Sequence, residues 1–140
     1  MSLRLAASAA GRWCLNAYVS GGLITYSNEL KMKLADVNSG TLERFGAVSE
    51  ETVLEMAAGG NKELGVDWCI SVSGIAGPLG GSEEKPVGTV WIAINGPGRS
   101  ISKQFLFGTD RQRTVQMTVL TALNRLRCEI LGINIEKKQS

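Results

Sequence analysis

The chain has 140 residues, of which 44% are hydrophobic and 20% are charged, and this composition is typical of one globular domain. No apolar run approaches the roughly 20 residues that are needed to cross a bilayer, so we expect no membrane partner. The net charge is only +2, with no basic cluster beyond Lys137 and Lys138, which argues against a nucleic-acid partner.

Cysteine and histidine usage narrows the chemistry. The chain has an odd number of cysteines and no CxxC pair, which favours a reducing, cytoplasmic location over a disulfide framework. The cysteines are Cys14, Cys69 and Cys128. The chain has no histidine, which excludes Ser-His and Cys-His nucleophile pairs, and we expect neither a metal nor another cofactor. Catalysis would have to use tyrosine, lysine, serine, threonine, arginine or carboxylate groups.

The first half of the chain predicts helices around one short strand. Residues 2–18 place apolar side chains at helical spacing, and Leu23–Ser27 is a β-branched and aromatic run that predicts a strand. Residues 28–37 predict a short helix, with a further turn over residues 41–45. Ser49 is a good N-cap for a helix that reaches about residue 64. Its two central glycines, at 59 and 60, either bend the helix or let another backbone approach.

The second half predicts a sheet and a long helix. Trp68–Val72 and Val87–Ile94 have the length and composition of covered strands, and residues 100–107 predict a third strand after a turn at residues 95–98. Thr109 and Gln112 have the spacing of a capping box that opens the last helix, which Gly132 ends. These elements predict a single α/β domain over residues 1–140.

A glycine-rich loop joins the two covered strands and is the predicted binding site. Glycines let successive backbone N–H groups point at one anion, so the loop predicts a phosphate or carboxylate pocket. The alternative is a flexible connection whose glycines only make turns. Lys85 could neutralise an anion at this loop or pair with Glu83 or Glu84. The loop contains these residues: Gly74, Ala76, Gly77, Gly80 and Gly81.

Four side chains are candidates for chemistry. Tyr26 and Lys31 lie five residues apart across a predicted strand-to-helix corner, where a phenol and an amine could move protons and activate a hydroxyl; alternatively, they only pack and face solvent. Ser73 closes a strand, so its hydroxyl could face a carbonyl oxygen beside the loop amides, or it could stabilise a turn. Arg111 could offer a planar fork to an anion at a helix start, or lie on the surface.

Four segments together resemble one known family. They are GGLITYSNELK at Gly21–Lys31, ERFGAVSEETVLEMA at Glu43–Ala57, SVSGIAGPLGGSEEKPVGTVWIAI at Ser71–Ile94 and FGTDRQ at Phe107–Gln112. They resemble the CinA C-terminal domain, the family of bacterial PncC-type nicotinamide-nucleotide amidases whose name carries a competence/damage-inducible association. The resemblance covers about residues 19–126. It implies a three-layer α/β/α sandwich that forms a homodimer or a larger homo-oligomer.

The resemblance also implies a reaction in pyridine nucleotide salvage. Nicotinamide mononucleotide is hydrolysed at its carboxamide, without a metal or cofactor, to nicotinic acid mononucleotide and ammonia. By the same resemblance, Tyr26 and Lys31 match catalytic positions, Ser73 matches the Thr or Ser position near the oxyanion, and Arg111 contacts the substrate. The loop would hold the nucleotide through Gly74, Ala76, Gly77, Gly80 and Gly81.

The chain departs from the family pattern at two places. The family's nucleophilic serine lies in an ESCTGG motif that this sequence lacks, so the 1–140 domain is expected to be N-terminally shortened. Thr109 replaces the glycine of the family's GDR motif, and Val115 stands where a further arginine often lies. Two functions therefore stay open: an active amidase, or a catalytically inactive nucleotide-binding or scaffold homologue.

Overall fold

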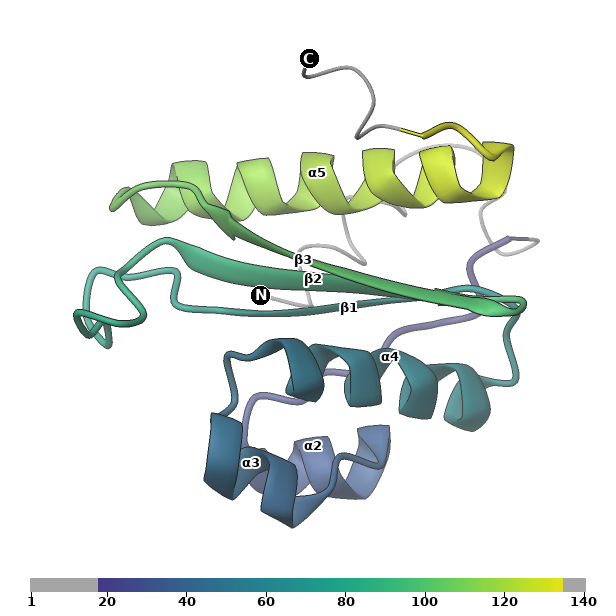
Figure 1. The fold of residues 1–140 in the computed structure, drawn as a ribbon, viewed down its shortest axis with the longest axis horizontal. Coiled ribbons are helices and arrows are strands. Elements are labelled where there is room, and N and C mark those ends of the chain that lie inside the picture. Colours follow the sequence, from purple (N-terminus) through teal and green to yellow (C-terminus); the bar gives the residue numbers. More distant parts are fainter. Residues whose placement is uncertain (1–17, 135–140) are drawn as a thin grey trace.

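The structure of the protein, a computed structural model, describes residues 18–134; the helix predicted over residues 2–18 falls almost entirely outside them. Within residues 18–134, three helices precede the sheet and one follows it (Figure 1). In chain order the elements are α2 (Asn28–Ala35), α3 (Ser39–Phe45), α4 (Glu50–Leu64), β1 (Cys69–Gly74), β2 (Thr89–Gly96), β3 (Arg99–Leu106) and α5 (Arg111–Leu131).

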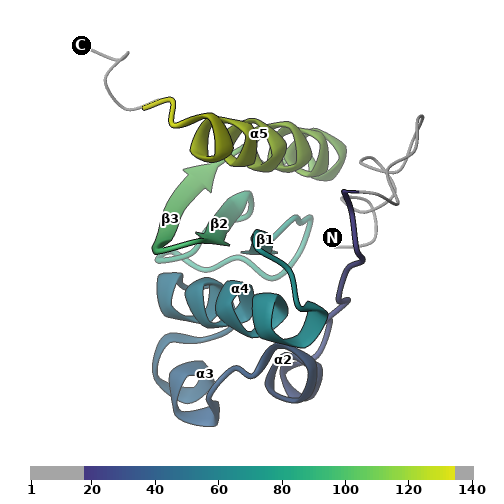
Figure 2. The same ribbon diagram turned by 90° about the vertical axis from the view of Figure 1, so that its right-hand side faces the viewer.

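The strands form an antiparallel sheet in the order β1-β2-β3. Ser73 pairs with Trp91 in the first ladder, and Ile92 pairs with Lys103 in the second. Helix α5 covers one face of the sheet and α4 covers the other, with α2 and α3 outside α4 (Figures 1 and 2). The predicted three-layer α/β/α arrangement and its three sheet strands are thereby confirmed.

Strand alternation divides the core between the two faces of the sheet. Val90 and Ile92 on one face of β2 pack with Ala122 of α5. Ala93, on the opposite face of β2, packs with Val53 and Ala57 of α4. Side chains at successive strand positions point to opposite faces, so β2 supplies both cores. Because all of these side chains are almost completely buried, β2 is the central element of the fold.

The strand predicted at Leu23–Ser27 is wrong. This segment has no regular secondary structure, although its residues have high strand propensity. A strand requires a neighbour that exchanges main-chain hydrogen bonds, and no such ladder joins this segment to any strand of the described part of the chain. The segment instead runs past the side of β1 that faces away from β2 to reach α2 (Figure 2).

Helix starts follow local hydrogen bonds. Ser49 is the N-cap of α4, as predicted, and its hydroxyl accepts a hydrogen bond from the Thr52 N–H. The predicted N-cap of α5 is one residue wrong: Asp110, rather than Thr109, caps the helix, and its carboxylate accepts from the Arg113 N–H at 2.6 Å. A carboxylate at this position also complements the helix dipole, which explains why Asp110 rather than Thr109 is the N-cap.

The paired glycines of α4 permit a close helix contact. A Cβ atom added to Gly59 would lie 1.9 Å from the carbonyl oxygen of Ala35, which belongs to α2. Only a residue without a side chain allows this approach. The sequence left open whether these glycines bend α4 or let another backbone approach; at Gly59 the structure shows the approach of another backbone.

Candidate functional site

An open cavity of about 830 Å³ lies at the end of the sheet where β1 ends and α5 begins. This volume is in the range of small-molecule sites. Three parts of the chain line it: Tyr26 before α2, the loop after β1, and the first turns of α5. The lining residues are Tyr26, Gly74, Ile75, Ala76, Gly77, Leu79, Gly80, Asp110, Arg111, Gln112 and Val115.

Main-chain contacts hold the glycine-rich loop in a defined shape. Gly77 has a φ of 80°, and a Cβ atom there would lie 2.4 Å from a methyl group of Val87, so the position requires glycine. A cis peptide bond joins Gly77 to Pro78. Gly81, predicted to bind substrate, does not line the cavity; it lies against the backbone of Val87, where an added Cβ would be 2.7 Å from the nitrogen.

Arg111 joins the loop to α5. Its guanidinium donates a hydrogen bond of 2.9 Å to the Gly77 carbonyl oxygen, and both residues line the cavity. The guanidinium and the free N–H groups of the first helical turn favour an anion here. The neighbouring Asp110 carboxylate adds a negative charge to the same wall, so the cavity presents both signs of charge.

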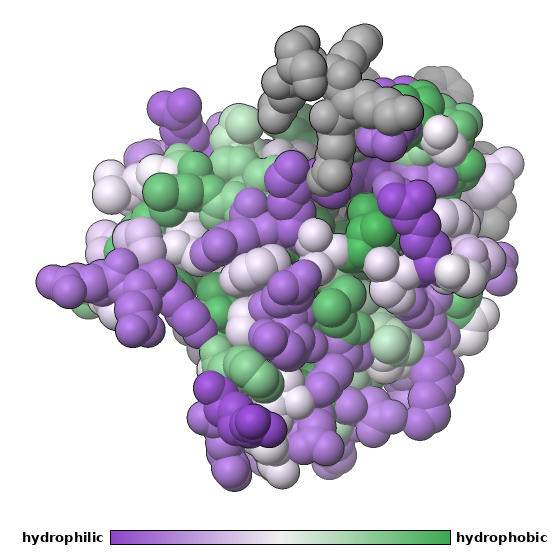
Figure 3. Space-filling model, viewed as in Figure 1, coloured by the Kyte–Doolittle hydropathy of each residue, from purple (hydrophilic) through white to green (hydrophobic). Residues whose placement is uncertain are grey.

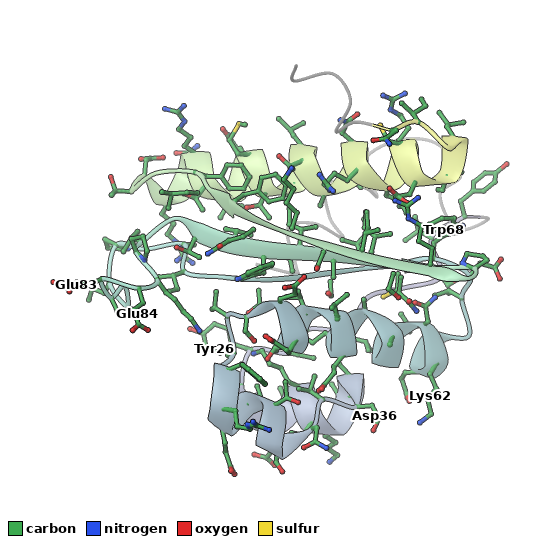
Figure 4. All side chains as sticks on the ribbon, viewed as in Figure 1. Tyr26, Asp36, Lys62, Trp68, Glu83 and Glu84 are labelled. Atoms are coloured by element: carbon green, nitrogen blue, oxygen red, sulfur yellow. The ribbon has the colours of Figure 1, made fainter. Side chains whose placement is uncertain are left out.

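Tyr26 and Lys31 contribute differently to the site. The Tyr26 side chain lines the cavity and is 91% exposed, and Figure 4 shows it at the end of the molecule that also carries Glu83 and Glu84. Lys31 is buried outside the cavity lining, where its ammonium donates to the carbonyl oxygens of Thr25 at 2.9 Å and Tyr26 at 3.5 Å. Burial lowers the pKa of Lys31 below the ordinary 10.5. Lys31 therefore fixes the main chain that carries Tyr26.

Ser73 points away from the cavity. Its hydroxyl is buried and donates a hydrogen bond of 2.6 Å to the carbonyl oxygen of Ala47, which precedes α4. The next residue, Gly74, belongs to the cavity lining, but strand alternation directs the Ser73 side chain to the α4 face. The hydroxyl of Ser71 makes the equivalent contact with the Val53 carbonyl. Both serines thus tie β1 to α4.

Lys85 lies in neither of its predicted environments. Its ammonium donates a hydrogen bond of 2.7 Å to the Phe45 carbonyl oxygen at the end of α3, and it does not line the cavity. Within residues 18–134, it forms no ion pair with Glu83 or Glu84. Lys85 therefore anchors the loop to the helical layer.

The chemical groups of the cavity lining are few. Across the described lining, the Tyr26 phenol is the only hydroxyl, because no serine or threonine takes part. Asp110 and Gln112 are lining residues that the sequence analysis missed, although their position beside Arg111 in FGTDRQ was the available signal.

Burial raises the pKa of the Cys69 thiol, which keeps it protonated as a packing residue.

Two further features concern the part of the chain from residue 18 to residue 134. No group of three or more His, Cys, Asp or Glu side chains there could hold a metal ion. No helix within the same range is both long and apolar enough to span a bilayer.

The cavity, its glycine-rich loop and the helices on both faces of the sheet define an α/β/α domain with a small-molecule pocket. The family model of the CinA C-terminal domain matches residues 8–130, and the chain belongs to this family. A CinA-like protein of Parasynechococcus marenigrum is 49% identical over 119 residues, which are 84% of this chain and 28% of that protein. The chain thus spans less than a third of the length of the curated relatives it matches.

Solved structures agree with this assignment. The competence damage-inducible protein A (ComA) of Klebsiella pneumoniae matches with a TM-score of 0.83 and 38% identity, over 88% of this chain and 76% of that one. A competence-damaged protein (CinA) superfamily protein from Escherichia coli matches with a TM-score of 0.84 and 32% identity, over 88% of this chain and 72% of that one.

Proposed function

We propose that this domain binds nicotinamide mononucleotide in the cavity and hydrolyses its carboxamide, as its resemblance to nicotinamide-nucleotide amidases implies. The observation that carries the proposal is the joining of the Arg111 guanidinium to the glycine-rich loop at the start of α5, inside a cavity of small-molecule size. Nicotinamide mononucleotide carries a negative phosphate and a positive pyridinium ring. A wall that presents Arg111 beside Asp110 suits a ligand with both charges.

The proposed reaction replaces the amide nitrogen with an oxygen from water. A hydroxyl attacks the carboxamide carbon, the C–N bond breaks and ammonia leaves, and water then releases the carboxylate product. Tyr26 would transfer protons at the cavity mouth, and Lys31 would position it through the main-chain carbonyls that it holds. The attacking hydroxyl would have to come from outside the described lining, because that lining holds no serine or threonine and Tyr26 is assigned to proton transfer.

A second candidate function is nucleotide binding without hydrolysis. Two observations favour it: the described cavity lining holds no serine or threonine that could attack, and the Ser73 hydroxyl is hydrogen-bonded to the Ala47 carbonyl and so is not available near the oxyanion. Such a domain would bind nicotinamide mononucleotide and its acid product without converting one into the other.

Calorimetry and an ammonia assay on the purified chain separate the two functions. An active amidase binds nicotinamide mononucleotide and releases ammonia faster than a Tyr26→Phe control does. Binding without release of ammonia identifies the second function, and absence of both refutes the proposed use of the cavity. The homodimer or larger homo-oligomer expected from the resemblance remains a proposal, which light scattering on the same sample tests.

A further inference from the structure

One short connector, residues 45–47, holds both stems of the glycine-rich loop. Its Ala47 carbonyl accepts a hydrogen bond of 2.6 Å from the hydroxyl of Ser73, which directly precedes the loop. Its Phe45 carbonyl accepts a hydrogen bond of 2.7 Å from the ammonium of Lys85, near the end of the loop. The two stems are thus attached to neighbouring peptide groups, although both lie far from the connector in the sequence.

The start of α4 holds the connector in place. The Gly46 carbonyl accepts hydrogen bonds from two hydroxyl groups, those of Ser49 at 3.0 Å and Thr52 at 2.8 Å. Both of these side chains are buried, and Ser49 is also the N-cap of α4. Because the connector is already fixed in this way, little conformational freedom is lost when a donor binds its carbonyl groups.

The two stems differ in what else secures them. Ser73 belongs to β1, whose pairing with Trp91 of β2 holds that stem independently of the serine hydroxyl. Lys85 lies outside the strands, in a turn where the Ser82 N–H donates to the Lys85 carbonyl at 2.9 Å and the Lys85 N–H donates to the Ser82 hydroxyl at 3.1 Å. These two contacts hold the turn together but do not attach it to the helices. The Lys85 ammonium does so.

The turn projects into solvent. Its residues Glu83 and Glu84 are exposed, and hydrophilic residues project at the end of the molecule where these two are labelled (Figures 3 and 4). A projecting polar turn buries little apolar surface, so packing contributes little to its order. Its position therefore depends on hydrogen bonds, and the bond from Lys85 reaches from the turn to the helical layer.

The turn is continuous with the part of the loop that lines the cavity. Gly77 and Leu79 are lining residues, and the turn begins at Ser82. The Arg111 guanidinium holds the Gly77 carbonyl from the side of α5. Lys85 holds the loop from the side of α3 and α4. The segment between these two attachment points forms one wall of the cavity.

We propose that Lys85 is a positioning residue for the ligand site, which acts through the connector to hold the glycine-rich loop in the shape that binds the ligand. Lys85 itself does not line the cavity, whereas the segment that it restrains does. Without the restraint, the shape that binds is a smaller fraction of the population, and the apparent Kd rises in proportion. The inference rests on the proposed function for the identity of the ligand, but not for the restraint.

Lys85→Met tests the restraint, because methionine keeps much of the apolar stem and removes the donor. Calorimetry with nicotinamide mononucleotide should give a Kd raised by roughly three- to tenfold, as loss of one hydrogen bond produces. Lys85→Arg keeps a donor and should restore the Kd to within about twofold of that of the unmodified chain. The charge control is Lys62→Met, in the last turn of α4 (Figure 4), which should change the Kd by less than about twofold because salt screens distant exposed charges.

Hydrogen exchange of the chain without ligand separates positioning from direct contact with the ligand. The Ser82 amide, which donates to the Lys85 carbonyl, should exchange about threefold faster or more in Lys85→Met and at the original rate in Lys85→Arg. The Ile75 and Gly88 amides, whose hydrogen bonds close the base of the loop, should keep their rates in both variants.

The results that would overturn the inference differ from those that refute the proposed function. An unchanged Kd in Lys85→Met would overturn it, and so would failure of Lys85→Arg to restore the Kd. A raised Kd with unchanged Ser82 exchange would show that Lys85 contacts the ligand, and faster exchange at Ile75 and Gly88 would show general destabilisation; either result overturns the inference. If the unmodified chain does not bind the nucleotide, the proposed function fails, and the Ser82 exchange rates alone support or overturn the restraint.

Discussion

Gly59→Ala should destabilise the protein, although alanine is the better helix former. A glycine within an exposed helix costs about 1 kcal/mol relative to alanine, so this substitution normally stabilises. Here the new Cβ would lie 1.9 Å from the Ala35 carbonyl oxygen and 2.4 Å from its carbon. Both obstructing atoms are backbone, so the clash can be relieved only by moving α2 away from α4.

The size of the effect follows from these two opposing contributions. Overpacking a well-filled contact typically costs about 1–3 kcal/mol, and a clash with rigid backbone belongs at the upper end. After the gain in helix propensity is subtracted, we expect the free energy of unfolding to fall by about 2 kcal/mol. For a domain of this length, that change corresponds to a Tm lower by roughly 5–10 °C.

Urea denaturation followed by circular dichroism measures this change, and a neighbouring glycine provides the control. A Cβ atom on Gly60 would meet only the Cys69 side chain, with the sulfur 2.6 Å away. In a Cys69→Ala background, Gly60→Ala should therefore be neutral or stabilise by up to about 1 kcal/mol. A Gly59→Ala variant as stable as the unmodified chain would refute the proposed close approach of α2 and α4.

Three further substitutions test the site. Arg111→Met should weaken binding of nicotinamide mononucleotide by roughly 10–100-fold, because a charged hydrogen bond contributes about 1.5–3 kcal/mol. Calorimetry measures the Kd. The control is Arg127→Met, near the other end of α5, whose Kd should stay within about twofold of that of the unmodified chain. Ser73→Ala should lower the free energy of unfolding by about 1–3 kcal/mol, because the Ala47 carbonyl loses its donor. The Kd for the nucleotide should stay unchanged. A changed Kd with unchanged stability would contradict the role of Ser73 in tying β1 to α4. Burial lowers the pKa of Lys31. Between that lowered pKa and 10.5, the folded state therefore binds fewer protons than the unfolded state. The free energy of unfolding of the unmodified chain, compared with that of Lys31→Met, should accordingly rise with pH through this window. A stability difference that stays constant across the window, measured by urea denaturation, would contradict the burial of a charged ammonium.

Elements with strong local signals were predictable from sequence. Ser49 starts α4 and Gly132 ends α5 as expected, because each makes its contact within a few residues along the chain. The strand predicted at Leu23–Ser27 failed for the opposite reason. Strand formation depends on a neighbouring strand, which the local sequence does not specify.

The site was only partly predictable. The glycine-rich loop, except for Gly81, and Arg111 line one cavity, whereas local sequence indicated each of them only as a separate anion-binding candidate. The orientation of Ser73 was not predictable, because the sequence does not say which parity of β1 faces α4. The sequence left open whether Lys31 lies near the Tyr26 phenol or faces solvent; its amine is instead buried and binds carbonyl oxygens, since a buried ammonium needs nearby acceptors.

The contact between Arg111 and Gly77 couples the cavity wall to its contents. A guanidinium has five N–H groups, so it can hold the Gly77 carbonyl and still offer donors to an anion. Under the proposed function, a nucleotide that binds these donors would stabilise the loop, and a stabilised loop would by the same amount favour binding of the nucleotide. A saturating nucleotide should consequently shield the bond after Leu79, whose side chain is 87% exposed, from proteolytic cutting.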